Sequence, residues 1–191
     1  MAILKIARMG NPVLRRRADP VADPAAPAVR ALVEDMLQTM EDANGAGLAA
    51  PQVHVPLRVV VFHVPEARAA REREEPVPLT VLINPEIEPL TQETAEGWEA
   101  CLSVPGLAGL VPRFTHIRYR GIGLDGAPIE REARGFHARV VQHECDHLDG
   151  ILFPQRMRDL SLLVFADEMR HVTPPAAGAR TPTAEELSDA D

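Results

Sequence analysis

The stretch GFHARVVQHECDHLDG, from Gly135 to Gly150, decides how the rest of the chain is interpreted. Apolar residues and histidines recur in it at steps of three and four. In a helix this spacing puts four of them on one face, namely Phe136, Val140, His143 and His147. Gly150 stands just past this pattern, where glycine commonly ends a helix. The pattern therefore predicts a helix over Gly135–Leu148 with two histidines on an otherwise apolar face.

Within this helix His143, Glu144 and His147 form the pattern HExxH. Histidines four residues apart lie one turn apart on the same face and can share a metal ion, with the carboxylate beside the first. Two imidazoles buried on an apolar face each need hydrogen-bond partners, and a shared metal satisfies both. A catalytic ion of this kind also needs a third protein ligand and an open position for water.

The chain has two cysteines, and only one of them is a good candidate for that third ligand. Cys145 lies two residues after His143, about 200° around the helix, so we expect it to point away from the ion as a small buried residue. Cys101 stands in WEACLSVPG, where a short strand could present a thiolate beside the helix. Spacing alone does not decide between a metal ligand and a free buried cysteine at position 101.

Two further helices are predicted outside this stretch. The first begins near Asp23-Pro24, with Pro27 as a later alternative start, and ends at Asn44-Gly45, where a left-handed residue is expected. A third helix is predicted from about Asp159 to His171. From residue 172 the chain consists mainly of Pro, Ala, Thr and acidic residues without periodicity, so residues 172–191 are expected to be a disordered acidic tail.

Short runs rich in Val, Ile and Leu predict strands. Leu57–Val64 and Leu79–Ile83 fit buried strands, and a polar segment separates them. Ile117–Leu124, Asp125-Gly126 and the following PIEREA predict a hairpin with a tight primed turn. The elements do not alternate as in a doubly wound sheet, so we predict one α+β domain over residues 1–171. Small antiparallel or mixed sheets should pack around the central metal-binding HExxH helix.

Composition excludes several classes of protein. The 191 residues carry a formal net charge of -8, which argues against specific DNA binding because phosphate neutralisation needs clustered cations. No apolar run approaches the ~20 residues that span a bilayer, and the N-terminus does not have the pattern of an export signal. A cytoplasmic location without membrane attachment is therefore expected, and a disulfide framework is not.

Three segments resemble, in order and spacing, the signature motifs of peptide deformylases: GAGLAAPQ at Gly45–Gln52, EACLS at Glu99–Ser103 and HECDH at His143–His147. INPEI at Ile83–Ile87 and VPRF at Val111–Phe114 are also similar, and the resemblance covers roughly residues 3 to 170. The WEAC and VPRF context most resembles mitochondrial-type members.

This resemblance implies a metallohydrolase that removes the N-terminal formyl group from N-formylmethionine of nascent polypeptides and releases formate. By the same resemblance Cys101, His143 and His147 bind one divalent metal, and a water on that metal is the nucleophile. The metal is expected to be Fe²⁺, with Zn²⁺, Ni²⁺ or Co²⁺ as substitutes. Glu144 acts as general base and then acid, while Gln52 and the backbone N–H of Leu102 stabilise the oxyanion.

The resemblance also implies a substrate pocket formed by Gly45, Gly47, Ala100, Arg139 and Val140. The two glycines should let the loop approach a peptide that binds as an extended strand. The chain departs from the family pattern with Ala100 in place of a common Gly, with Arg139 in place of an aliphatic residue, and with Ala108 where bacterial members often carry Arg. The expected partners are formylmethionyl nascent peptides, with transient ribosome association.

Two other functions compete with this interpretation. A zinc peptidase with HExxH would cut internal peptide bonds, but the metzincin pattern HExxHxxGxxH needs a distal His that LDGILFPQRM, after His147, does not contain. A non-catalytic module would use a closed four-ligand metal site for stability, whereas this chain offers three ligands and Glu144. Assays with formyl-Met peptides and with casein distinguish a deformylase from a zinc peptidase.

Overall fold

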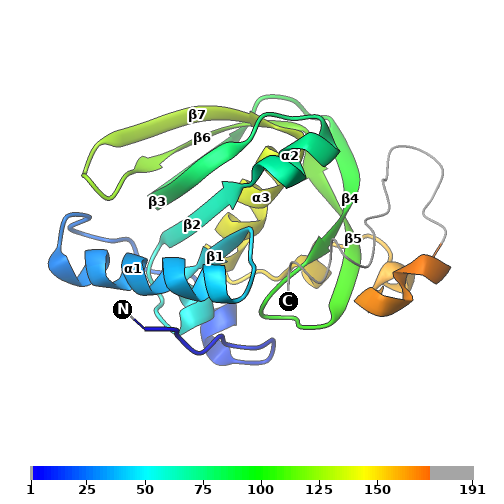
Figure 1. Ribbon diagram of the computed structural model, residues 1–191, viewed down its shortest axis with the longest axis horizontal. Helices are drawn as coiled ribbons and strands as arrows, with labels where there is room; N and C mark the ends of the chain where they lie inside the picture. The colour runs from blue at the N-terminus through cyan, green and yellow to red at the C-terminus, as the bar shows by residue number, and fades with distance from the viewer. Residues whose placement is uncertain (1, 173–191) are drawn as a thin grey trace.

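The strands form two separate antiparallel sheets in the computed structural model, which describes residues 2–172 (Figure 1). The five-stranded sheet has the order β1-β2-β3-β6-β7, and the three-stranded sheet has the order β4-β5-β8. The strands are β1 (Gly47–Ala49), β2 (Val59–Val64), β3 (Val77–Pro89), β4 (Thr94–Ala100), β5 (Leu107–Phe114), β6 (His116–Ile122), β7 (Pro128–Arg134) and β8 (Val164–Phe165). The predicted α+β class is confirmed.

Helices lie on both faces of the larger sheet and between the sheets. The α-helices are α1 (Pro27–Asp42), α2 (Glu66–Glu72) and α3 (Gly135–Leu148). Short 3₁₀ helices are η1 (Pro12–Arg15), η2 (Ala50–Val53), η3 (Phe153–Gln155), η4 (Leu160–Leu162) and η5 (Ala166–His171). Within the part of the chain that the structure describes, none of the helices is long and apolar enough to cross a membrane.

Strand β2 is buried on both faces, and its side chains alternate between two cores. Val60, Phe62 and Val64 pack in the cluster that contains residues of α3, whereas Val59 and Val61 pack in the cluster that contains residues of α1. Successive side chains of a strand point to opposite faces, so a strand covered on both sides needs an unbroken apolar run. The predicted buried strand is therefore confirmed, and this arrangement fixes α3 against the larger sheet.

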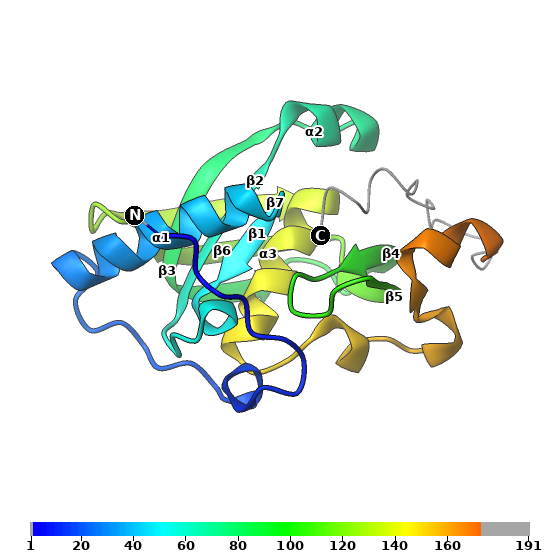
Figure 2. The same ribbon diagram turned by 60° about the horizontal axis from the view of Figure 1, so that its bottom comes forward.

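Helix α3 has the predicted bounds and lies between the two sheets in both views (Figures 1 and 2). Ala138, Val141 and Leu148 are fully buried in the core that α3 shares with the larger sheet. The helix ends shortly before Gly150, which has φ +75°, and a Cβ there would lie 2.7 Å from the Arg15 carbonyl carbon. Glycine therefore both ends α3 and lets the chain pass η1 closely.

The predicted third helix over Asp159–His171 is wrong. This segment forms η4, the short strand β8 and η5. Val164 and Phe165 pair with Ala108 and Leu107 of β5, so the segment supplies a partner for a strand that would otherwise be an edge. Hydrogen bonds to an open sheet edge outweigh the modest helix propensity of the local sequence.

Of two smaller predictions, one is narrowed and one needs correction. Helix α1 begins at Pro27, the later of the two expected starts, and Asn44, with φ 51°, supplies the expected left-handed residue after it. The β6–β7 hairpin is present, but its loop spans Gly123–Ala127, and only Gly126 in that loop has a positive φ. A two-residue primed type I′ turn needs positive φ at both central residues, and Asp125 instead accepts a hydrogen bond from the Ala127 N–H. Apart from Val172, the predicted tail lies outside the described residues.

Candidate metal centre

Three potential metal ligands meet where the end of β4 reaches α3. Three atoms that could bind a metal ion lie within 4.8 Å of one another, and they come from Cys101, His143 and His147. Cys101 directly follows the last residue of β4, and its Sγ lies 3.4 Å from Nε2 of His147. The two imidazole rings stand almost perpendicular, at 84°, with centroids 5.0 Å apart. The structure thus brings together the three residues that were expected to be metal ligands.

The surroundings of these side chains fit a divalent metal ion. Nδ1 of His143 lies 2.8 Å from a carboxylate oxygen of Glu99, so Nε2 is the ring nitrogen that could bind a metal ion. Burial lowers the pKa of His143, but hydrogen bonds to Cys101 and Glu99 outweigh it and hold that pKa well above its usual range. Burial and the charge of His143 lower the pKa of His147, which keeps it neutral. The negative groups favour a positive charge here, and thiolate with imidazole is a donor set for Zn²⁺ or Fe²⁺.

Glu144 places a carboxylate beside Cys101, His143 and His147, which are called the ligand cluster below. The side chain is buried, and its Oε2 has no hydrogen-bond partner within residues 2–172. Burial raises the pKa of Glu144 to about 7. A Cβ on Gly47 would overlap the Glu144 carboxylate, so only glycine leaves room for it at that position. Gly47 therefore has a role that the sequence did not suggest, which is to accommodate Glu144.

Gln52 directs an amide donor at the same cluster. Its Oε1 accepts a hydrogen bond of 2.8 Å from the Ala49 N–H, so its Nε2 must point the other way. Nε2 lies 3.2 Å from Ser103 Oγ and 3.6 Å from Cys101 Sγ. Leu102 is beside it in a turn that the Val104 N–H closes by donating to the Cys101 carbonyl. Both donors predicted from the sequence therefore adjoin the ligand cluster.

The ligand cluster lies in a cavity of about 100 Å³. All the predicted site residues except His147, which is buried, line this cavity. Five further lining residues were not predicted as site residues, namely Ala46, Arg68, Trp98, Glu99 and Phe136. Phe136 could have been found because it shares the predicted helix face with the histidines. Arg68 comes from a polar segment that has no motif.

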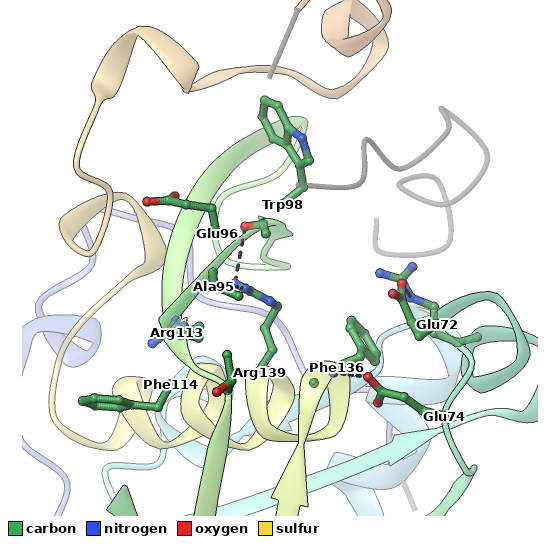
Figure 3. Close-up of a pocket in the computed structure, with 13 residues that line it drawn as sticks. Glu72, Glu74, Ala95, Glu96, Trp98, Arg113, Phe114, Phe136 and Arg139 are labelled. Atoms are coloured by element: carbon green, nitrogen blue, oxygen red, sulfur yellow. Dashed lines mark hydrogen bonds and ion pairs between the residues drawn. The ribbon is translucent and has the colours of Figure 1, made fainter. Parts of the chain in front are cut away.

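The Arg139 side chain extends from α3 to β4, where its guanidinium donates hydrogen bonds to other groups of the protein. Its guanidinium donates to the carbonyls of Ala95 (2.8 Å), Gly97 (3.3 Å) and Val111 (2.8 Å), and to Glu99 Oε1 (2.9 Å). Figure 3 shows the side chain rising from α3 toward Ala95. A Cβ on Gly97 would lie 2.6 Å from the guanidinium carbon. The charge of Arg139 is therefore paired within the protein, and Gly97 makes the space for its guanidinium.

A chain of buried ion pairs connects the ligand cluster to the surface. Arg113 holds both oxygens of Glu99 at 2.8 and 2.9 Å and an oxygen of Asp146 at 2.5 Å. Arg156, which is partly exposed, holds the other Asp146 oxygen at 2.6 Å. Burial alone would raise the pKa of Glu99, but the charge and hydrogen bonds of Arg113 hold it well below its usual range. These ion pairs fix the position of Glu99 relative to α3, and Glu99 in turn orients the His143 ring.

Replacing Arg113 with Met should lower the free energy of unfolding by about 3–5 kcal/mol, because Glu99 and Asp146 lose a buried partner. The matched control is Arg120→Met on β6, whose ion pair with Glu130 is half-exposed and should contribute little. Denaturant unfolding of both variants measures the difference. Equal effects of the two substitutions would show that the buried pair does not support the fold.

Comparisons with known proteins agree with this geometry. The family model for polypeptide deformylase matches residues 3–162. Peptide deformylase 1 of Bordetella pertussis is 57% identical over 82% of this chain and 88% of its own length. Peptide deformylase 1 of Nitrosomonas europaea is 50% identical over 87% of this chain and 94% of its own length.

Solved structures give the same result. The Met-Ala-Ser-bound class I type b peptide deformylase of Acinetobacter baumannii has a TM-score of 0.75 and 37% identity, covering 81% of this chain and 98% of that one. These relatives are bacterial, so the predicted closeness to mitochondrial-type members finds no support in them. The chain belongs to the polypeptide deformylase family.

Proposed function

We propose that this protein is a peptide deformylase, which hydrolyses the N-terminal formyl amide of nascent polypeptides that begin with N-formylmethionine and releases formate. The observation that carries the proposal is the cluster of Cys101, His143 and His147 beside the buried carboxylate of Glu144. Relatives named peptide deformylase at 50–57% identity support it. So does the solved relative that binds Met-Ala-Ser.

We propose that Cys101, His143 and His147 hold one divalent metal ion, with Glu99 orienting His143 from behind. When bound, such an ion supplies the Lewis acidity that activates a water molecule near neutral pH and polarises the formyl carbonyl. The family resemblance favours Fe²⁺, and the donor set also suits Zn²⁺, Ni²⁺ or Co²⁺.

Glu144 is the proposed proton carrier. It takes a proton from the attacking water and passes it to the nitrogen of the leaving amine, so that the amide C–N bond breaks and formate leaves. Its Oε2, which has no hydrogen-bond partner in the described chain, supports this role because buried carboxylate oxygens are normally paired. Gly47 keeps the space beside it open.

Gln52 and the Leu102 backbone N–H are the proposed oxyanion donors. Negative charge develops on the formyl oxygen as water attacks, and donors that are already aimed at that point stabilise it more than they stabilise the substrate. The Ala49 N–H supports this assignment, because it holds the Gln52 carbonyl oxygen and turns the amide nitrogen toward Cys101.

The peptide is proposed to bind as an extended strand between the two sheets. Strands β1 and β4 are edge strands of their respective sheets, and each ends beside the ligand cluster. Backbone groups of an edge strand can accept an added strand. The proposed contacts come from Gly45, Gly47, Ala100, Arg139 and Val140. A cytoplasmic location and transient ribosome association are predictions that follow from this substrate class.

The wild-type protein, purified without oxygen, should contain one metal ion per chain and release formate from formyl-Met-Ala-Ser. Metal analysis of the same preparation identifies the ion. Casein is the control, because a peptidase with this motif would cleave it. Casein cleavage without formate release would point to a zinc peptidase, and bound metal with neither activity would point to a non-catalytic metal site.

A further inference from the structure

The cavity that holds the ligand cluster, here called the central cavity, adjoins two others. One, of about 210 Å³, lies beside β4 and includes Glu72, Glu74 and Glu96 among its lining residues (Figure 3). The other is a groove of about 520 Å³ beside α1, lined in part by Leu37 and Met40. We call them the β4 cavity and the α1 groove. Together they offer routes for a peptide out of the central cavity.

Arg68 of α2 and Phe136 of α3 line all three of these spaces. The guanidinium carbon of Arg68 lies 4.3 Å from the centre of the Phe136 ring, in a cation–π contact. The Arg68 side chain is 21% exposed and lies 3.6 Å from the Glu72 carboxylate. The stacked pair therefore stands at the junction where the three spaces meet.

This junction lies at the end of the central cavity away from the ligand cluster. Gln52, Cys101 and Glu144 line the central cavity but neither of its neighbours. On α3, Phe136 precedes His143 by seven residues, which corresponds to about 10 Å along a helix. An extended peptide advances about 3.3 Å per residue, so this separation spans about three residues. A substrate with its formyl group at Glu144 would have its second or third residue beside Arg68.

We propose that Arg68 is a substrate-binding residue that donates hydrogen bonds to a main-chain carbonyl of the second or third residue of the formylated peptide. This inference rests on the proposed function. A guanidinium carries five donors in a planar fork and can serve several acceptors at once, so its ion pair with Glu72 is compatible with binding a peptide. A main-chain carbonyl is present whatever the peptide sequence, as a substrate class of nascent chains requires.

Two substrates of different length test the proposal. Formyl-Met-Ala-Ser amide reaches the junction, whereas formyl-Met amide ends before it, and the amide caps remove the terminal carboxylate. For the longer substrate, Arg68→Gln should raise KM about tenfold, because one charged hydrogen bond is lost, and should leave kcat unchanged. For the shorter substrate, both kcat and KM should stay unchanged. Arg68→Lys keeps the charge but not the planar fork of donors, so its KM for the longer substrate should lie between that of the wild type and that of Arg68→Gln.

The matched control is Arg73→Gln, which removes the same charge at the exposed end of the same helix and lines none of the three spaces. It should leave both substrates unaffected. If Arg68→Gln changes KM equally for both substrates, or for neither, while the wild type turns both over, this inference is overturned and the proposed function stands. If the wild type releases formate from neither substrate, the proposed function fails and the inference with it.

Discussion

Cys101→Ser and His143→Ala should each lose stoichiometric metal and deformylase activity together. The site offers three protein ligands, so removal of one leaves two, which is too few to hold the ion. Serine is close to cysteine in size, but its hydroxyl does not ionise near neutral pH and is a poor substitute for a thiolate. Metal analysis and formate release, measured on the same preparations, test the prediction.

Cys145→Ser is the matched control for this experiment. Cys145 lies on the same helix as the histidines but packs in the core against the larger sheet, where burial raises the pKa of its thiol. The substitution should lower the melting temperature, because it buries a hydroxyl, and leave the metal content unchanged. Full metal occupancy in Cys101→Ser and His143→Ala, or the same metal loss in Cys145→Ser, would contradict the proposed ligand set.

The part of the site on α3 could be predicted because helical periodicity fixes it locally. The spacing of His143 and His147 determines that both side chains face the same way, and the structure has the helix bounds expected from the sequence. Spacing within the helix also places Cys145 on another face. Cys101 is different, because its approach to His147 depends on how β4 packs against α3, which no local pattern encodes.

The features that were missed depend on pairing between distant segments. Arg113 holds Glu99 because β4 and β5 pair, and it reaches Asp146 because this hairpin packs against α3. Segment Asp159–His171 forms no continuous helix, because β5 offers its edge to Val164 and Phe165. Helix α2 did have a local signal, since EARAARE is rich in strong helix formers. That segment was treated only as polar, and Arg68 was overlooked with it.

Glu144→Gln should lower kcat at least ~10²-fold and leave metal content and KM nearly unchanged, because the side chain keeps its shape but loses its ability to accept a proton. Glu144 is not among the three clustered ligands, so metal binding does not require it. The effect therefore differs in kind from that of Cys101→Ser, which should remove metal and activity together. Steady-state kinetics with formyl-Met-Ala-Ser, with metal analysis of the same samples, distinguishes them.

Glu144→Asp adds a second test of the same role. It keeps the carboxylate but withdraws it by one methylene from the position that Gly47 leaves open for it. Turnover should therefore lie between that of the wild type and that of Glu144→Gln, since general base catalysis needs both the right group and hydrogen-bond reach. Wild-type turnover in Glu144→Gln would require another base. Loss of metal in that variant would instead make Glu144 part of the metal site, and the proton transfer would then need a different carrier within the same cavity.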